Sequence, residues 1–262
     1  MLIVDSHCHA AQSWYEPIEV LLFEMDSNGV DKAVLIQHNG AFDNSYLFEC
    51  SARYPGRLAI VAMVDVSRPD ALERLCYWYE EGAVGVRLWP TWRSSGSDPL
   101  AIWKKASELG LVVSCLGEID DFASDEFNSL VSELPGLTIV VEHLAGVGQA
   151  CEEPSYINYK KVLELASYPN TYIKIPGLGE INARPPVLNR DFGFDRTPPV
   201  IEMALNAFGP ERSMWGSDFP PSAGREGYRN ALLGIVEHPA LANVDDREWV
   251  MGRTAQKVFK FD

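Results

Sequence analysis

The residues best suited to chemistry are two histidines in the N-terminal segment Asp5-Ser6-His7-Cys8-His9. Side chains two positions apart on a strand point to the same side, so His7 and His9 should project together while Cys8 points away. Two neutral imidazoles on one side of a strand supply half of the ligands of a metal site. The chain has only five histidines, so this spacing favours a functional pair over two unrelated polar residues in a loop.

Two further candidates follow apolar runs elsewhere in the chain. Asp218 lies in the segment MWGSDFP, residues 214–220, and His143 follows the segment IVVE, residues 139–142. An acidic side chain directly after a buried strand costs free energy unless it is paired or bound. Asp218 is therefore expected to be a catalytic residue, or else the cap of a turn or helix. His143 is either catalytic or a hydrogen-bonded structural residue.

Three charged residues lie in or directly after other apolar runs. Glu118 follows the segment VVSCLG and could supply an oxygen ligand, or could be a surface carboxylate. Lys174 lies inside TYIKI and Arg87 inside GVRL. The planar guanidinium of Arg87 suits a carboxylate or a polarised carbonyl. For both Arg87 and Lys174, a contact with substrate and a structural ion pair remain open.

The long connection of residues 176–199 carries three arginines, Arg184, Arg190 and Arg196. Long loops in compact domains are usually functional or disordered. These arginines are predicted either to contact substrate or to be solvated loop charge. Of the remaining histidines, His38 is expected to have a supporting or structural role, and His238 a structural one.

Eight short apolar runs account for the placement of all these residues. They are Leu2–Asp5, Ala33–Gln37, Leu58–Val64, Val84–Leu88, Leu111–Cys115, Leu137–Glu142, Thr171–Ile175 and Ser213–Gly216. Several are almost continuously apolar, as strands buried on both faces are. Helical patterns alternate with them, and this alternation predicts a parallel sheet.

Proline and glycine mark the ends of four of the helical segments. They run from Pro17 to Gly29, from Pro69 to Gly82, from Pro99 to Gly110 and from Pro198 to Gly209. Proline in the first turn and glycine past the end are typical of helices. Eight strand–helix units in 262 residues fit one closed α/β barrel, a (β/α)8 TIM barrel, spanning residues 1–262 as a single domain. A doubly wound open sheet is disfavoured because no glycine-rich phosphate loop follows the first run.

The charge balance limits the partners. The net charge is −15, which disfavours binding to nucleic acid or to an anionic membrane surface. An anionic substrate would need a local basic pocket. Five scattered cysteines without a CxxC pair indicate a reducing compartment. With no signal peptide or transmembrane segment recognisable, we expect a cytoplasmic protein.

The whole pattern resembles the amidohydrolase-related family, particularly its branch of 2-pyrone-4,6-dicarboxylate hydrolases, 4-sulfomuconolactonases and fuconolactonases. The resemblance is carried, in order, by VDSHCH, GVDKAVLIQ, DNSYLFECSARYPGRL, GVRLW, LTIVVEHLAG, TYIKIPGL, MWGSDFP and GRTAQKVFKF. It implies a (β/α)8 barrel in which His7, His9 and Asp218 match the family's HxH and last-strand aspartate. His143 and Arg87 match its sixth-strand histidine and its strand-end arginine.

The resemblance implies hydrolysis of a small carboxylated lactone or a related amide. One divalent metal ion, Zn²⁺ or Mn²⁺, would be held by His7, His9, Asp218 and Glu118. Asp218 would activate water, His143 would bind the carbonyl oxygen or the ligand shell, and the cations would bind substrate. A metal-free variant of the same mechanism also stays open.

Two rival functions remain. One is a metal-dependent decarboxylase of an aromatic or muconate-type acid, but decarboxylases of the wider family use a fifth-strand histidine that is absent here. Glu118 lies nearest that place. The other rival is an inactive barrel that binds a small molecule. The sequence leaves homo-oligomerisation open.

Overall fold

The computed structural model describes residues 1–148, 155–188, 193–194 and 197–261. Its single sheet has eight parallel strands in the order β1 to β8. The strands are β1 (Val4–Cys8), β2 (Lys32–Ile36), β3 (Leu58–Met63), β4 (Gly85–Leu88), β5 (Val112–Cys115), β6 (Ile139–Val141), β7 (Thr171–Ile175) and β8 (Ser213–Trp215). β1 also contacts β8, and Cys8 bridges to Phe219 beyond the end of β8. The predicted (β/α)8 barrel is therefore confirmed.

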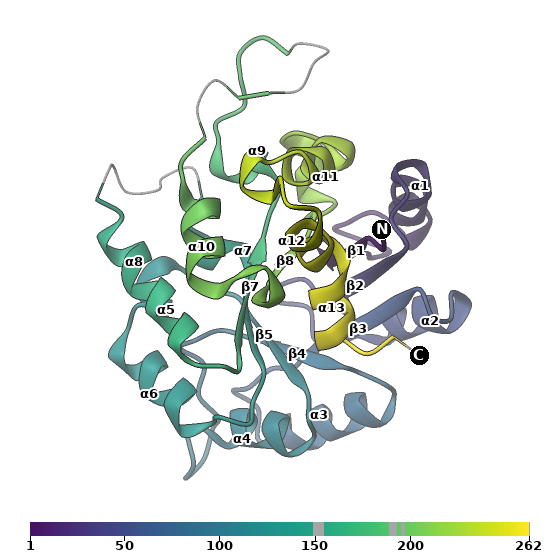
Figure 1. Cartoon of the computed structure of the whole chain (residues 1–262). Coiled ribbons are helices and arrows are strands. Elements are labelled where there is room, and N and C mark those ends of the chain that lie inside the picture. Colours follow the sequence, from purple (N-terminus) through teal and green to yellow (C-terminus); the bar gives the residue numbers. More distant parts are fainter. Residues whose placement is uncertain (149–154, 189–192, 195–196, 262) are drawn as a thin grey trace.

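Helices surround the strands and follow one another around the barrel (Figure 1). They are α1 (Ile18–Asn28), α2 (Ser45–Arg53), α3 (Ala71–Glu80), α4 (Ala101–Glu108), α5 (Ile119–Phe122), α6 (Asp125–Glu133), α7 (His143–Gly146), α8 (Ile157–Leu163), α9 (Leu178–Ile181), α10 (Val200–Phe208), α11 (Tyr228–Val236), α12 (Val244–Glu248) and α13 (Thr254–Val258). The predicted punctuation marks α1, α3, α4 and α10. Gly29, for example, ends α1 in the left-handed region, with φ 70°.

The first strand differs most from its predicted bounds. It runs from Val4 to Cys8, so His7 belongs to the strand and His9 follows it directly. The pairing with β2 is irregular between Asp5 and Cys8. Val4 packs in the barrel interior, yet His7, an odd number of residues later, also reaches the interior. An inserted residue of this kind changes which side chains face inward.

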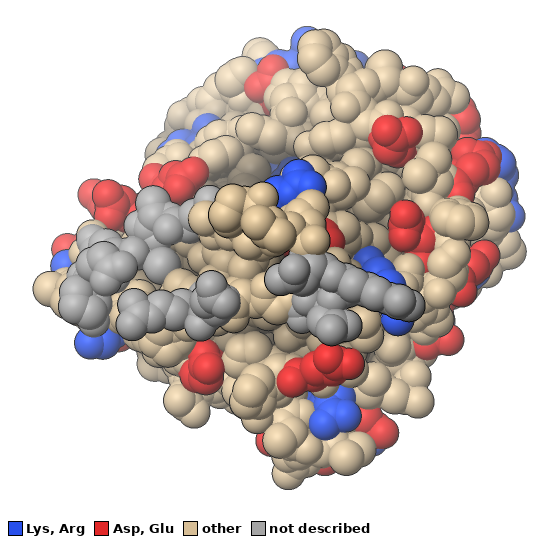
Figure 2. Space-filling view, turned by 90° about the horizontal axis from the view of Figure 1, so that it is seen from above, with Lys and Arg blue, Asp and Glu red and all other residues tan. Residues whose placement is uncertain are grey.

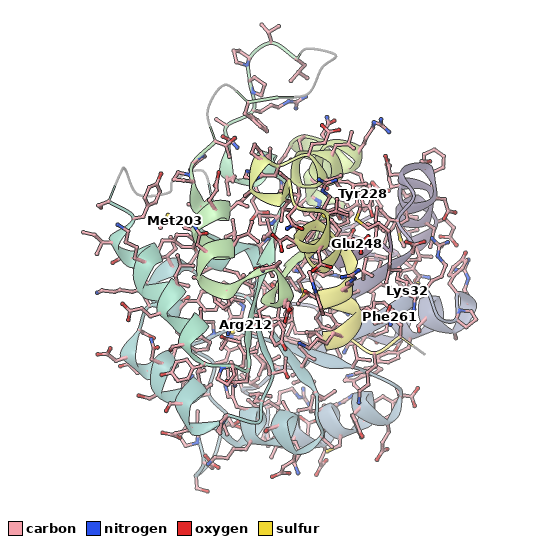
Figure 3. The ribbon with its side chains drawn as sticks, in the orientation of Figure 1. Lys32, Met203, Arg212, Tyr228, Glu248 and Phe261 are labelled. Carbon is pink, nitrogen blue, oxygen red and sulfur yellow. The ribbon has the colours of Figure 1, made fainter. Side chains whose placement is uncertain are left out.

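The barrel interior is apolar at the end where the strands begin. Val34, Val61, Val112 and Met214 pack there around Phe259, which follows α13. The C-terminal segment also covers this end, because the ammonium of Lys32, at the start of β2, lies 4.9 Å from the centre of the Phe261 ring (Figure 3). The interior is thus closed where the strands begin.

Nearer the ends of the strands, the barrel interior holds a layer of inward-pointing polar side chains. Strand alternation places Ser114 two residues after Val112, and Glu142 two residues after Val140. Arg87 on β4 and Lys174 on β7 complete the layer, and all four side chains are buried.

None of the helices among the described residues has the length and apolar character that spanning a membrane requires.

Candidate active site

His7, His9 and Asp218 converge where the strands end. Nε2 of His7 lies 3.8 Å, and Nε2 of His9 lies 3.4 Å, from Oδ1 of Asp218. All three residues are buried. The structure therefore brings together residues from the two ends of the sequence: the histidine pair predicted from its spacing and the aspartate predicted from its position after the last apolar run.

Asp5 holds the first and last strands in this arrangement. Its carboxylate accepts hydrogen bonds from the backbone N–H of Ser217 (2.8 Å), from the Ser217 hydroxyl (2.6 Å) and from the Tyr228 hydroxyl (3.0 Å). The N–H of Asp218 donates to the carbonyl of His7 at 2.8 Å. Asp218 has a φ of 52°, a strained conformation for a residue other than glycine. These bonds hold the Asp218 backbone in this conformation and its carboxylate beside the two histidines.

The hydrogen bonding of the histidines suits a metal ion. Nδ1 of His9 lies 2.7 Å from the carbonyl of Ile36, which can only accept, so Nδ1 carries the proton. Nε2 of His9 is then the ring nitrogen left to face a metal ion, and it lies 3.4 Å from Oδ1 of Asp218. Nε2 of His7 is buried without a hydrogen-bond partner among the described residues. Two imidazole nitrogens and a carboxylate oxygen are ligands that Zn²⁺ accepts, and the carbonyl that orients His9 is a usual partner of a metal-binding histidine.

His143 lies beside this group, and neighbouring carboxylates raise its pKa. Its ring centre is 4.5 Å from that of His7, and its Nδ1 lies 3.0 Å from Oε1 of Glu180. Burial alone would lower the pKa of His143, but Glu180 and Asp218 outweigh burial and raise it to about 9. His143 is consequently an imidazolium at neutral pH, with Nδ1 donating to Glu180.

Arg225 and Glu180 extend the charged group, and sequence analysis identified neither. Nη1 of Arg225 lies 2.9 Å from Oδ2 of Asp218 and 3.3 Å from Oε2 of Glu180. Burial would raise the pKa of Asp218, but His143, His9 and Arg225 hold it well below its usual range. Both residues lie in the segments that follow strands, Glu180 five residues after the end of β7 and Arg225 ten residues after the end of β8. This position, in segments that follow strands, is the feature of the sequence that could have identified them as candidates.

Arg87 forms a buried ion pair, one of the two alternatives left open by its sequence. Its Nη2 and Nε lie 2.7 and 3.1 Å from Oε2 of Glu142, and its Nη1 donates to the carbonyl of Gln37 at 3.1 Å. Burial would raise the pKa of Glu142, but Arg87 and Lys174 lower it to about 2. Glu142 is thus a third functional candidate, after Arg225 and Glu180, to which sequence analysis gave no role.

Lys174 also lies inside the barrel. Its Nζ is 2.7 Å from Oγ of Ser114, 3.1 Å from Nδ1 of His7 and 3.8 Å from Oε1 of Glu142. Burial lowers the pKa of Lys174 to about 8. Burial and the neighbouring Lys174 charge hold the pKa of His7 well below its usual range, so His7 is neutral. Arg87 and Lys174 are both engaged by protein groups, and their contact with substrate stays a prediction.

Glu118 does not join the other predicted ligands. It is exposed at the start of α5, where its N–H donates to Asp121 at 3.1 Å. Among the described residues, the carboxylate that shares a potential metal-binding group with His7 and His143 is Glu142. The chain leaves the barrel mouth directly after β5, which carries Glu118 outward. We therefore correct the expected ligand set by removing Glu118.

The remaining candidates lie around this centre. Arg184 is exposed, whereas Arg190 and Arg196 lie outside the described residues. His38 is half-buried, with its ring 5.2 Å from that of Tyr15. His238 accepts a hydrogen bond from the N–H of Ala240 at 3.3 Å, which is a structural role.

A cleft of about 690 Å³ adjoins the site on the side of β1 and β2. Tyr15 lines it and stacks on the His9 ring at 5.3 Å. The face seen from above carries many acidic side chains and fewer basic ones (Figure 2).

The profile of the amidohydrolase family matches residues 4–261. The chain belongs to this family. Among curated proteins, it is 30% identical over 135 residues to the L-fucono-1,5-lactonase of Burkholderia ambifaria, covering 49% of this chain and 43% of that protein. It is 32% identical over 98 residues to an uncharacterised protein of Sinorhizobium fredii, covering 37% and 30%. The chain thus spans less than half the length of either relative.

Solved structures share the fold of this amidohydrolase. A zinc-bound amidohydrolase of Burkholderia multivorans superposes with a TM-score of 0.80 at 19% identity, covering 100% of both chains. A structure described as a 2-pyrone-4,6-dicarboxylic acid hydrolase, from Pseudomonas putida, gives 0.76 at 21% identity, covering 100% and 98%. A 2,6-dihydroxybenzoate decarboxylase of Rhizobium gives 0.68 at 15% identity, covering 99% of both chains. At these identities the likeness concerns the fold alone.

Proposed function

We propose that this amidohydrolase hydrolyses a small lactone, with Asp218 as the base that activates water. The observation that carries the proposal is the ionised Asp218 carboxylate, which lies 3.4 and 3.8 Å from two imidazole nitrogens and 2.9 Å from Arg225. A carboxylate kept ionised among donors can hold a water molecule in one orientation. General-base catalysis requires this geometry.

The residues divide the reaction between them. Asp218 takes a proton from the attacking water, whose oxygen bonds to the carbonyl carbon of the ester. The imidazolium of His143 donates a hydrogen bond to the carbonyl oxygen as negative charge develops there. When the ring C–O bond breaks, Asp218 returns its proton to the departing alkoxide, and a hydroxy acid is released.

His7, His9 and Asp218 would hold a divalent ion, Zn²⁺ or Mn²⁺. Such an ion would polarise the ester carbonyl and lower the pKa of water. Support comes from Nε2 of His7, which is buried without a hydrogen-bond partner among the described residues, and from the zinc reported in the Burkholderia multivorans structure. The lactone hydrolase named among the curated relatives supports the reaction class. A related amide is a second substrate for the same chemistry.

The test is a substrate panel assayed with the metal-supplemented protein. We expect ring opening of five- and six-membered lactones, followed as acid release, to depend on Asp218. A parallel assay for carbon dioxide release from 2,6-dihydroxybenzoate addresses the decarboxylase alternative. Carbon dioxide release without lactone hydrolysis would replace the proposal with decarboxylation, and the absence of both would favour a binding protein.

A further inference from the structure

Arg225 has one edge that its contacts with Asp218 and Glu180 leave unused. Those contacts are made by Nη1, whereas Nε and Nη2 are buried and have no hydrogen-bond partner among the described residues. Nε and Nη2 lie on the same edge of a guanidinium, and this edge can bind a carboxylate side-on. Buried donors without a partner cost free energy, so an acceptor is expected beside them.

Glu226, the next residue in the chain, carries a suitable acceptor. Its side chain is 1% exposed, and no side chain among the described residues donates a hydrogen bond to either of its carboxylate oxygens. Oε2 of Glu226 lies 3.6 Å from Nε of Arg225. Burial raises the pKa of Glu226, and the positive charge of Arg225 opposes that rise. A buried carboxylate therefore adjoins the unused edge of a guanidinium.

The barrel interior contains an arginine that uses the same edge. Nε and Nη2 of Arg87 lie 3.1 and 2.7 Å from Oε2 of Glu142. The separation between Arg225 and Glu226 is larger, but it joins the same type of nitrogen to the same type of oxygen. A small rotation of either side chain would close it into a hydrogen-bonded pair.

Two glycines make room for the Glu226 carboxylate. Gly177 precedes α9 and Gly179 lies within it, and α9 packs against α11, the helix that begins just after Glu226. Neither glycine has a positive φ, so backbone conformation does not explain them. A Cβ on Gly179 would overlap Oε2 of Glu226, and a Cβ on Gly177 would overlap Oε1. The segment that carries Glu180 therefore packs directly on the Glu226 side chain.

We propose that Glu226 is a positioning residue, which binds the Nε and Nη2 edge of Arg225 and so keeps Nη1 in contact with Asp218 and Glu180. The inference rests on the proposed lactone hydrolysis, because it concerns the orientation of the base in that reaction. With Oδ2 of Asp218 held by Arg225, Oδ1 is the oxygen that faces the two histidines. Glu226 is buried, so it acts through Arg225 and not on the substrate.

The substitution Glu226→Gln tests the charge of this residue, because it keeps the side-chain volume. We expect kcat for lactone hydrolysis by the metal-supplemented protein to fall about ten- to 100-fold, since misplacing a catalytic group by about 1 Å can cost about 100-fold. KM should stay unchanged. Glu237→Gln, which removes an exposed carboxylate at the end of α11, is the matched control and should have no effect. A Glu226→Gln protein with wild-type kcat would overturn the proposal.

A double-mutant cycle shows whether Glu226 acts through Arg225. Arg225→Met removes the guanidinium and should itself lower kcat. Adding Glu226→Gln to Arg225→Met should cause no further loss, because the effects of residues that act through one another are not additive. Losses that multiply in the double variant would show that Glu226 acts independently of Arg225 and would overturn the proposal.

Gly179→Ala separates positioning from packing. The three atoms nearest to a Cβ at this position all belong to Glu226, whereas a Cβ on Gly177 would also meet Ala231. The added methyl group should displace the carboxylate and lower kcat as Glu226→Gln does. Adding Glu226→Ala gives the methyl group room, so the melting temperature should recover while kcat stays low. Recovery of both would show that Glu226 only fills space, contrary to the proposal.

Heteronuclear NMR reports on the pair without any reaction. The Nε–H signal of Arg225, assigned by its absence in Arg225→Lys, should exchange slowly with water in the wild-type protein because the pair is buried. It should shift and exchange faster in Glu226→Gln but not in Glu237→Gln. If no lactone is hydrolysed, the proposed function fails, and this measurement alone decides the inference. An Nε–H signal that is the same in Glu226→Gln and wild type would overturn it.

Discussion

The buried pair of Arg87 and Glu142 shows how single residues set the properties of the barrel interior. Removing one partner of a buried ion pair leaves an uncompensated charge and costs about 3–5 kcal/mol. Arg87→Met should therefore lower the melting temperature markedly, and adding Glu142→Gln should restore part of it. Thermal unfolding followed by circular dichroism measures both. A stable Arg87→Met protein that fails only on carboxylated substrates would instead assign Arg87 to substrate binding.

The pair of His143 and Glu180 should be visible in the pH dependence of activity. The pKa of His143 is raised to about 9, so the protonated donor is present below that pH and is lost as pH rises through it. We expect kcat/KM to fall above about pH 9. Glu180→Gln removes the nearest negative charge and should move this alkaline limb to lower pH. A limb that stays in place in Glu180→Gln would show that another group controls it.

Sequence alone predicts a residue's chemistry better than its partners. His7, His9 and Asp218 could be predicted because their types and their positions after apolar runs suffice. Glu142 and Glu180 could not, because their importance comes from cations supplied by other strands and loops. Glu118 had a suitable type and position, but the chain direction after β5 carries it outward.

At the scale of elements, the contact between β1 and the loop after β8 aligns the site through Asp5. Asn at position 5 could accept from the backbone N–H groups of His7 and Ser217 and donate to the hydroxyls of Ser217 or Tyr228. Asp5→Asn should thus fold well. Asp5→Ala leaves two buried N–H groups unpaired and should lose about 3 kcal/mol in the free energy of unfolding. Denaturant titration of both variants measures this.

The same variants carry a pH signature. Burial raises the pKa of Asp5 to about 6, so its contribution to stability is complete below about pH 4 and declines as pH rises through 6. The stability of Asp5→Asn relative to wild type should therefore increase over that interval. An unchanging difference between the two proteins from pH 4 to pH 7 would contradict the raised pKa.

Element boundaries could be predicted where hydrophobic pattern and strand coincide. Thr171–Ile175 has the predicted bounds because β7 begins and ends with the run of residues that suggested a strand. The first strand continues over the polar residues as far as Cys8 because their partners lie inside the barrel, and an irregular pairing turns His7 inward. Hydrophobicity cannot reveal a polar interior or an inserted residue.

At the scale of the whole molecule, metal content is the property to measure first. We expect about one divalent ion per chain in elemental analysis of the purified protein. His7→Ala and His9→Ala should lose it, whereas His238→Ala, which removes a structural histidine, should retain it. Full lactonase activity in a metal-free protein would contradict the metal and leave Asp218 acting on water directly.

The most direct test of the account is kcat/KM for lactone hydrolysis in Asp218→Asn. Asn preserves the side-chain volume and can still accept from Arg225, so circular dichroism should show an intact fold. It cannot accept a proton at neutral pH, and loss of a general base costs about 10²–10⁴-fold in rate. We therefore predict that Asp218→Asn lowers kcat/KM at least about 100-fold. A folded Asp218→Asn protein that keeps more than about a tenth of wild-type kcat/KM would contradict the assignment of Asp218 as the base.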